Sequence, residues 1–207
     1  MINIKVCGMR YACNIREIAS LPVHWMGFIF YDKSPRNALS IKSDFLHVIP
    51  ESISRTGVFV NSDFNTIMAT ATKFGLRTIQ LHGNESPELC NSLCSEGMEV
   101  IKAISVSIPD DIESVAEYEG CCHYFLFDTR TPLIGGSGRQ FNWDILRIYK
   151  GRTPFLLSGG IGASDVERIT LLSHPMLAGL DINSHFELAP GLKSVSQIDH
   201  FIKRLSK

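Results

Sequence analysis

The stretch Thr56-Gly57-Val58-Phe59-Val60-Asn61-Ser62-Asp63-Phe64 contains the alternation that decides the fold. Its first five residues form a nearly continuous apolar run, which is typical of a parallel strand covered on both faces. A helix is predicted next, because Asp63 is a good N-cap residue and apolar residues then recur with helical spacing at Phe64, Ile67, Met68 and Ala71. Gly75 provides a stop. The stretch therefore predicts one strand followed by one helix.

The same alternation runs through the whole chain. Apolar, β-rich runs begin near residues 2, 24, 55, 77, 99, 123, 154 and 178, at a mean spacing of about 25 residues. That spacing accommodates one strand, one helix and two short loops, and eight such units are what a (β/α)8 barrel requires. We therefore expect an α/β protein in which residues 1–207 form a single (β/α)8 TIM barrel domain.

Helix signals fill the gaps between the runs. Ser86-Pro87-Glu88 combines an N-cap residue, a proline at the first helical position and an acidic first turn. Another helix is predicted to begin at Asp110 or Asp111, and another at Ser164-Asp165. A doubly wound sheet shows the same alternation, but it usually has fewer strands at this length, and Gly135-Gly136-Ser137-Gly138 is not the glycine pattern of a dinucleotide fold.

Composition limits the classes of function. The 207 residues include 20 Lys and Arg against 21 Asp and Glu, for a net charge of −1 at pH 7. Proteins that bind nucleic acid or membrane surfaces through basic patches need a basic excess, so we expect neither partner. No signal-peptide pattern or membrane-spanning apolar stretch occurs, and six cysteines without a C-x-x-C pair are typical of a reduced, cytoplasmic protein. A thiol- or metal-binding protein that uses Cys90, Cys94, Cys121 and Cys122 is the alternative outside the enzymes.

Polar and reactive side chains gather where the apolar runs stop. In a (β/α)8 barrel the active site lies at the C-terminal ends of the strands. The residues at or near those ends include Cys7, Arg36, His82, Lys102, Asp128, Ser158 and Asp181. A purely structural barrel does not need this clustering, so we expect an active site at that face.

The last two strand ends favour a phosphate site. Gly159-Gly160-Ile161-Gly162 lets backbone N–H groups approach an anion closely. Asn183-Ser184 precedes residues 186–191, which could present a helix N-terminus to the same anion. The alternative is that these glycines only make tight turns.

Cys7 and Asp128 suggest a base and an acid. A thiol, with an ordinary pKa of about 8.5, becomes an effective base when a positive neighbour lowers that pKa, and a carboxyl becomes an effective acid when burial raises its pKa. Arg36 offers a guanidinium fork that matches a carboxylate. Taken singly, each residue also has an ordinary structural interpretation, as a small buried thiol or a turn arginine.

In chain order, the motifs resemble those of the phosphoribosylanthranilate isomerase family over essentially the whole chain. The matching segments are Lys5–Arg10, Gly27–Arg36, Gly57–Asn61, Gln80–Glu85, Phe127–Thr129, Gly135–Trp143, Leu157–Ile161, Gly179–Ser184 and Pro190–Lys193. The chain departs from the family pattern at Asn142, Asn183, His185 and Ser194. His185 stands where the family often has glycine, which removes backbone freedom from the phosphate loop.

The resemblance implies an Amadori rearrangement of N-(5'-phosphoribosyl)anthranilate to 1-(2-carboxyphenylamino)-1-deoxyribulose 5-phosphate, a step of tryptophan biosynthesis. It implies no metal and no cofactor, and it allows a monomer or a homodimer. Cys7 would be the general base, Asp128 the general acid, and Arg36 the partner of the anthranilate carboxylate. The remaining implied binding residues are His82 and Asp181, which line the site, and Gly159, Gly160, Asn183 and Ser184, whose backbone holds phosphate.

Two further expectations concern specificity and motion. The alternative function is another phosphate-binding barrel isomerase or epimerase acting on a phosphosugar, although an epimerase would bring sets of His and Asp metal ligands at the strand ends. Residues 129–140 form a long glycine-rich loop after the proposed acid, and we predict that this loop is a mobile lid.

Overall fold

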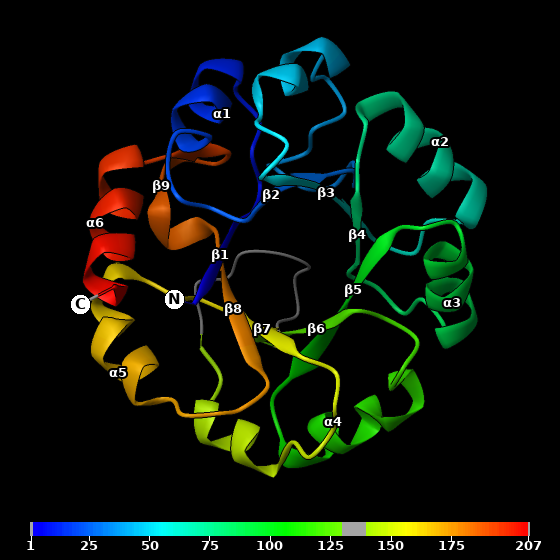
Figure 1. The fold of residues 1–207 in the computed structure, drawn as a ribbon, viewed down its shortest axis with the longest axis vertical. Helices are drawn as coiled ribbons and strands as arrows, with labels where there is room; N and C mark the ends of the chain where they lie inside the picture. Colours follow the sequence, from blue (N-terminus) through cyan, green and yellow to red (C-terminus); the bar gives the residue numbers. More distant parts are fainter. Residues whose placement is uncertain (1, 130–139, 207) are drawn as a thin grey trace.

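The computed structural model describes residues 2–129 and 140–206, and it confirms the predicted barrel. Eight parallel strands close in chain order from β1 to β8, with helices outside them (Figure 1). The strands are β1 Asn3–Val6, β2 Trp25–Ile29, β3 Ser54–Phe59, β4 Thr78–Leu81, β5 Glu99–Val106, β6 Tyr124–Thr129, β7 Phe155–Leu157 and β8 Leu177–Ile182. Residues 130–139, which make up most of the predicted lid, lie outside the described residues.

The outer ring is less regular than the strand spacing predicts. Its α-helices are α1 Ala12–Ile18, α2 Phe64–Phe74, α3 Pro87–Ser95, α4 Pro109–Glu113, α5 Val166–Leu171 and α6 Val195–Leu205. Short 3-10 helices supplement or replace them, namely η1 Ser43–Val48, η2 Ser114–Tyr118, η3 Trp143–Ile148, η4 Ala163–Asp165 and η5 Ser184–Phe186. Within the described residues, η1 and η3 are the helices that follow β2 and β6, so these two units have a single 3-10 helix each.

Local signals explain the helix boundaries. Asp63 caps α2 by accepting a hydrogen bond of 2.9 Å from the Thr66 N–H, and Gly75 ends the helix in the left-handed conformation at φ 58°. The helix predicted at Asp110 or Asp111 begins at Pro109, one residue earlier. Its entry is closed by the Asp111 carboxylate, which accepts hydrogen bonds from the N–H groups of Ser107 and Ile108 at 2.7 and 3.0 Å.

Apolar side chains from non-neighbouring strands meet inside the barrel. The Trp25 ring from β2 meets the Tyr124 ring from β6 at 5.6 Å between centroids, and these strands are not neighbours in the barrel. A small apolar cluster fills this interior, comprising Trp25, Ile101, Ala103, Leu126 and Leu156. A separate, larger core packs the strands against the helices. Polar side chains also lie at the strand starts, where Thr78 Oγ1 donates to Glu99 Oε2 at 2.6 Å and lies 2.6 Å from Ser54 Oγ.

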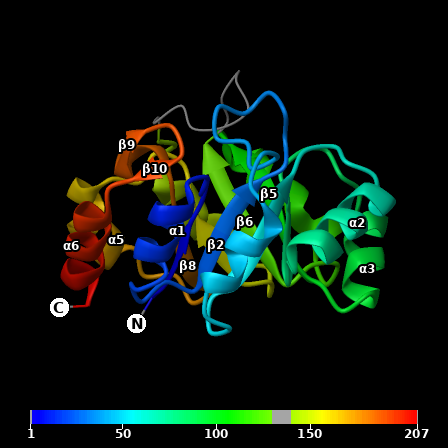
Figure 2. The ribbon, with the colours of Figure 1, turned by 90° about the horizontal axis from the view of Figure 1, so that it is seen from above.

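Figure 2 shows the two ends of the barrel from the side. Both termini lie at one end, and a short hairpin of β9 Glu187–Ala189 and β10 Leu192–Lys193 lies at the other. The hairpin therefore stands over the C-terminal ends of the strands, where the sequence places the site. Across residues 2–129 and 140–206, none of the helices has the length and apolar character needed to cross a bilayer.

Candidate active site

Strands β1 and β8 bring Lys5, Cys7 and Asp181 together. The two strands pair in parallel with Lys5 opposite Asp181, and the Cys7 N–H donates to the Ile182 carbonyl at 2.9 Å. Lys5 Nζ donates to Asp181 Oδ1 at 2.8 Å, and both side chains are buried. Ser158 Oγ donates to the other carboxylate oxygen of Asp181 at 3.3 Å. Cys7 therefore stands beside a buried lysine–carboxylate ion pair.

Gly27 makes the space for this arrangement. A Cβ atom at Gly27 would lie 2.8 Å from Cys7 Sγ and 3.2 Å from Lys5 Nζ. Both distances are shorter than ordinary van der Waals contact. The thiol and the ammonium can therefore share this pocket only because β2 has glycine at that point.

Burial dominates the chemistry of the Cys7 thiol. Cys7 is 4% exposed, and burial raises the pKa of its thiol, although the nearby Lys5 and Lys193 ammonium groups act in the opposite direction. Burial also lowers the pKa of Lys5, but Asp181 and Cys7 outweigh it, and the pKa is raised above its usual value. The lysine therefore stays protonated beside the thiol, whereas the thiol needs its positive neighbours to become a base.

Asp128 lies at the end of β6 beside His82. His82 Nε2 is 3.2 Å from Asp128 Oδ2, and the Thr129 N–H donates to Asp128 Oδ1 at 2.8 Å. On the other side of the imidazole, Gln80 Nε2 lies 2.6 Å from His82 Nδ1. Gln80 and Asp128 therefore hold the imidazole from its two ring nitrogens. The side chain of Asp128 is 21% exposed, which leaves it accessible to a ligand.

Arg36 is held by an internal carboxylate. Its Nε donates to both oxygens of Glu187 at 2.9 and 3.0 Å, and its Nη2 donates to Oε2 at 2.8 Å. Burial alone would raise the pKa of Glu187, but hydrogen bonds from Arg36 and Lys193 outweigh burial and lower it. One edge of the Arg36 guanidinium is thus bonded to Glu187, and this contact fixes the orientation of the remaining N–H groups.

Lys193 links the hairpin to the strand ends. Its buried ammonium donates to Glu187 Oε1 at 2.7 Å and to Asn183 Oδ1 at 2.6 Å, and burial lowers its pKa. Gly8 completes this corner in the left-handed conformation at φ 77°, where a Cβ atom would lie 2.9 Å from both Arg36 Cδ and Asn183 Oδ1. The residues after β1, β2 and β8 therefore meet at one point.

The predicted phosphate loops lie side by side after β7 and β8. Gly159 and Gly160 have φ values of 88° and 69°, and a Cβ atom on Gly159 would lie 3.1 Å from Asp128 Oδ1. Asn183 and Ser184 lead into η5, a single short turn. The helix predicted for residues 186–191 is wrong, because Phe186 ends η5 and the residues after it belong to the β9–β10 hairpin. The Glu187 carboxylate closes its turn by accepting from the Gly191 N–H at 2.9 Å.

A second buried ion pair supports the loop that carries His82. Lys102 Nζ donates to Glu85 Oε2 at 3.0 Å and to the Gly83 carbonyl at 2.7 Å, and both charged side chains are almost fully buried. The Glu85 carboxylate accepts in turn from the N–H groups of Asn61 and Gly83 at 2.8 and 2.9 Å. Lys102 therefore stabilises the loop that follows β4.

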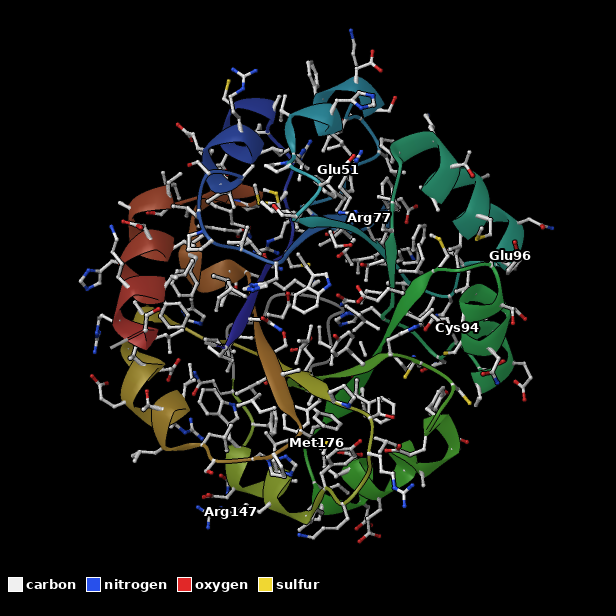
Figure 3. The ribbon with its side chains drawn as sticks, viewed as in Figure 1. Glu51, Arg77, Cys94, Glu96, Arg147 and Met176 are labelled. Carbon is white, nitrogen blue, oxygen red and sulfur yellow. The ribbon has the colours of Figure 1, made fainter. Side chains whose placement is uncertain are left out.

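The other cysteines lie apart from the site. Figure 3 shows Cys94 on α3 in the outer ring, away from the centre of the barrel. Its Sγ is 3.7 Å from His123 Nδ1. Within the described part of the chain, no group of three or more His, Cys, Asp or Glu side chains is placed to hold a metal ion.

The structure thus gathers all nine predicted site residues at the C-terminal ends of the strands. Prediction from the sequence omitted four partners that orient them: Lys5, Gln80, Glu187 and Lys193. Lys5 and Gln80 could have been found, because each stands two residues before a predicted site residue, and alternate residues of a strand share a face. Glu187 and Lys193 act through the hairpin, which no local pattern predicted.

Fold and site together define a (β/α)8-barrel enzyme in which a thiol and a carboxyl lie at one barrel mouth beside an arginine and glycine-rich loops. Comparison with known proteins narrows this class. The family model of N-(5'-phosphoribosyl)anthranilate (PRA) isomerase matches residues 4–204. A protein of Parabacteroides distasonis named N-(5'-phosphoribosyl)anthranilate isomerase is 47% identical over 204 residues, which cover 98% of this chain and 92% of the relative. The chain belongs to the PRA isomerase family.

Solved structures agree with this assignment. A crystal structure of phosphoribosyl anthranilate isomerase in complex with reduced 1-(o-carboxyphenylamino)-1-deoxyribulose 5-phosphate is 30% identical, with a TM-score of 0.83 over 100% of this chain and 99% of the other. A structure of monomers of the dimeric enzyme from Thermotoga maritima is also 30% identical, with a TM-score of 0.82 and the same coverage. The similarity thus extends over the whole barrel.

Proposed function

We propose that Cys7 is the general base and Asp128 the general acid of the PRA isomerase reaction in this chain. The observation that carries the proposal is their placement: the thiol follows β1 and the carboxyl ends β6, two strands that are not neighbours in the barrel. Both therefore face the same mouth from different sides. A substrate lying between them can be protonated on one side and deprotonated on the other.

The chemistry begins with these two proton transfers. Asp128 protonates the furanose ring oxygen of N-(5'-phosphoribosyl)anthranilate, and the ring opens to an iminium ion. That cation acidifies the C2' hydrogen, which the Cys7 thiolate removes to give an enolamine. The enolamine then tautomerises to 1-(2-carboxyphenylamino)-1-deoxyribulose 5-phosphate. The nitrogen of the substrate donates its electron pair when the ring opens and accepts a pair when C2' is deprotonated, and each positioned proton-transfer group typically contributes about 10²–10⁴ in rate.

Two anion sites orient the substrate at its ends. We assign the anthranilate carboxylate to the part of the Arg36 guanidinium that Glu187 leaves available. The phosphate belongs to the backbone N–H groups around Gly159, Gly160, Asn183 and Ser184, where glycine allows close approach. Asp181 and His82 line the space between them. Such double anchoring favours reaction because it holds the ribose in one orientation between acid and base.

A cytoplasmic location and a homodimer complete the proposal. All six cysteines are free thiols, which supports a reducing compartment. The Thermotoga maritima relative is described as dimeric, which supports a second copy as partner. Light scattering on the purified chain measures the mass in solution, and a monomer mass at micromolar concentration would remove the dimer from the proposal.

Substitution of the two groups tests the assigned roles. Cys7→Ala and Asp128→Asn should each lower kcat by about 10²–10⁴, measured as loss of anthranilate-type fluorescence from freshly made substrate. Cys13→Ala and Asp144→Asn are matched controls, because both side chains are exposed on the outer ring. Near-normal turnover in either site variant, with the fold intact by circular dichroism, would remove that residue from its role.

A further inference from the structure

Lys5 places a buried cation inside the barrel. Its side chain is completely buried on β1, two residues before Cys7 and on the same face of the strand. An ammonium buried in the barrel interior is costly unless it is paired. Retaining a lysine there therefore points to a role for its charge.

The contacts of Lys5 direct that charge at Cys7. Its ammonium donates to Asp181 Oδ1 at 2.8 Å and lies close to the Cys7 thiol, beside Gly27. Gly27 leaves room for the two atoms, since its missing Cβ would lie within 3.2 Å of both Lys5 Nζ and Cys7 Sγ. Ser158 holds the far oxygen of Asp181 at 3.3 Å. The ammonium thus sits in a defined position between a carboxylate and a thiol.

Three charged groups act on the Cys7 thiol: Lys5 from β1, Asp181 from β8 and Lys193 from β10. Lys193 also favours a thiolate, but its ammonium donates to Glu187 and Asn183 at 2.7 and 2.6 Å. Asp181 disfavours a thiolate. Lys5 has the largest effect of the three, and its ammonium shares the space beside Gly27 with the sulfur. It is therefore the main counter-charge available to a thiolate in this buried place.

We propose that Lys5 is a positioning residue for the base, with its ammonium paired to the Cys7 thiolate while Asp181 holds that ammonium in place. This role rests on the proposed function of Cys7. The proton balance is simple. Cys7 loses its proton to solvent before the reaction, the thiolate takes the C2' proton of the substrate, and Lys5 keeps its own protons throughout.

Removing the charge tests the role directly. Lys5→Met keeps the length and apolar stem of the side chain. The thiolate of Cys7 is followed as ultraviolet absorbance against pH, as the difference between each protein and its Cys7→Ala counterpart. We expect the midpoint to move to higher pH by about one unit or more, so that about tenfold less thiolate is present near neutral pH. An unchanged midpoint would overturn the proposal.

Two further variants keep the test decisive. Lys5→Met leaves Asp181 buried without its cation, so Lys5→Met with Asp181→Asn removes both charges and decides the question if the single variant does not fold. In this double variant the midpoint of the Cys7 thiolate titration should still lie above that of the unsubstituted protein. The increase should be smaller than in Lys5→Met alone. Lys102→Met removes the buried lysine of β5, which pairs with Glu85, and should leave the Cys7 midpoint in place.

Activity separates this inference from the proposed function. In Lys5→Met, the rising limb of kcat/KM against pH should move together with the thiolate midpoint. A shifted thiolate midpoint with an unshifted activity profile would show that Cys7 is not the base, and would refute the proposed function rather than the pairing of Lys5 with the thiol. An unshifted thiolate midpoint refutes the pairing itself, whatever the activity.

Discussion

Gly27 offers the sharpest test of the site geometry, because a single methyl group there displaces the proposed base. In Gly27→Ala the new Cβ would lie 2.8 Å from Cys7 Sγ and 3.1 Å from Cys7 Cα. Ordinary contact begins near 3.5 Å, so the sulfur must retreat by about 0.7 Å. Cys7 is 4% exposed, and the ammonium of Lys5 lies on the same pocket, so little space exists for that movement.

The expected losses of stability and of rate in Gly27→Ala have two causes, overpacking of the interior and misplacement of the Cys7 sulfur. Forcing one extra methyl group into a packed interior costs about 1–3 kcal/mol of stability. A misplacement of about 1 Å at a reacting group costs about 10²-fold in rate. We therefore expect Gly27→Ala to fold, to lose stability in that range, and to lose tenfold to about 10²-fold in kcat with a smaller change in KM.

Gly97→Ala is the matched control for the stability loss. Gly97 has φ 79°, so alanine is strained there by about 1 kcal/mol, but nothing lies within 4 Å of the added Cβ. Urea unfolding measures the free energy of both variants, and the fluorescence assay measures kcat. The reasoning fails if Gly27→Ala keeps kcat within twofold of the parent, or if Gly97→Ala loses activity to the same extent.

Two further predictions concern the arginine corner. Arg36→Ala should mainly raise KM, by about tenfold to 10²-fold, because a charge-assisted hydrogen bond contributes about 1.5–3 kcal/mol; an unchanged KM would remove Arg36 from the anthranilate site. The pKa of Glu187 is lowered by hydrogen bonds from Arg36 and Lys193, which outweigh burial. Its contribution to stability is therefore present above the ordinary carboxyl pKa of about 4.3 and is lost as the pH falls through the lower folded value. Unfolding titrations should show a shallower acid loss of stability in Glu187→Gln, and parallel curves would contradict the assignment.

The regular parts of the fold were predictable because their causes are local. Strand and helix periods are written in runs of a few residues, as in Val58 to Ala71, and caps such as Asp63 act within three residues. The same logic placed Cys7, His82 and Asp128 at strand ends. The helix predicted for residues 186–191 failed because Glu187 instead closes a hairpin turn onto Gly191, a side-chain contact that periodicity does not encode.

By itself the sequence determined the number of strand–helix units, the face on which the site lies and the residues capable of acid, base and anion chemistry. Only the tertiary structure decided how those residues are charged and aimed. Lys5 meets Asp181 across 176 positions and Arg36 meets Glu187 across 151, because closing the barrel places β1 beside β8 and folds the hairpin back over the strand ends. A side chain's identity is local, but the electric field around it comes from whatever the closed barrel brings within a few ångströms.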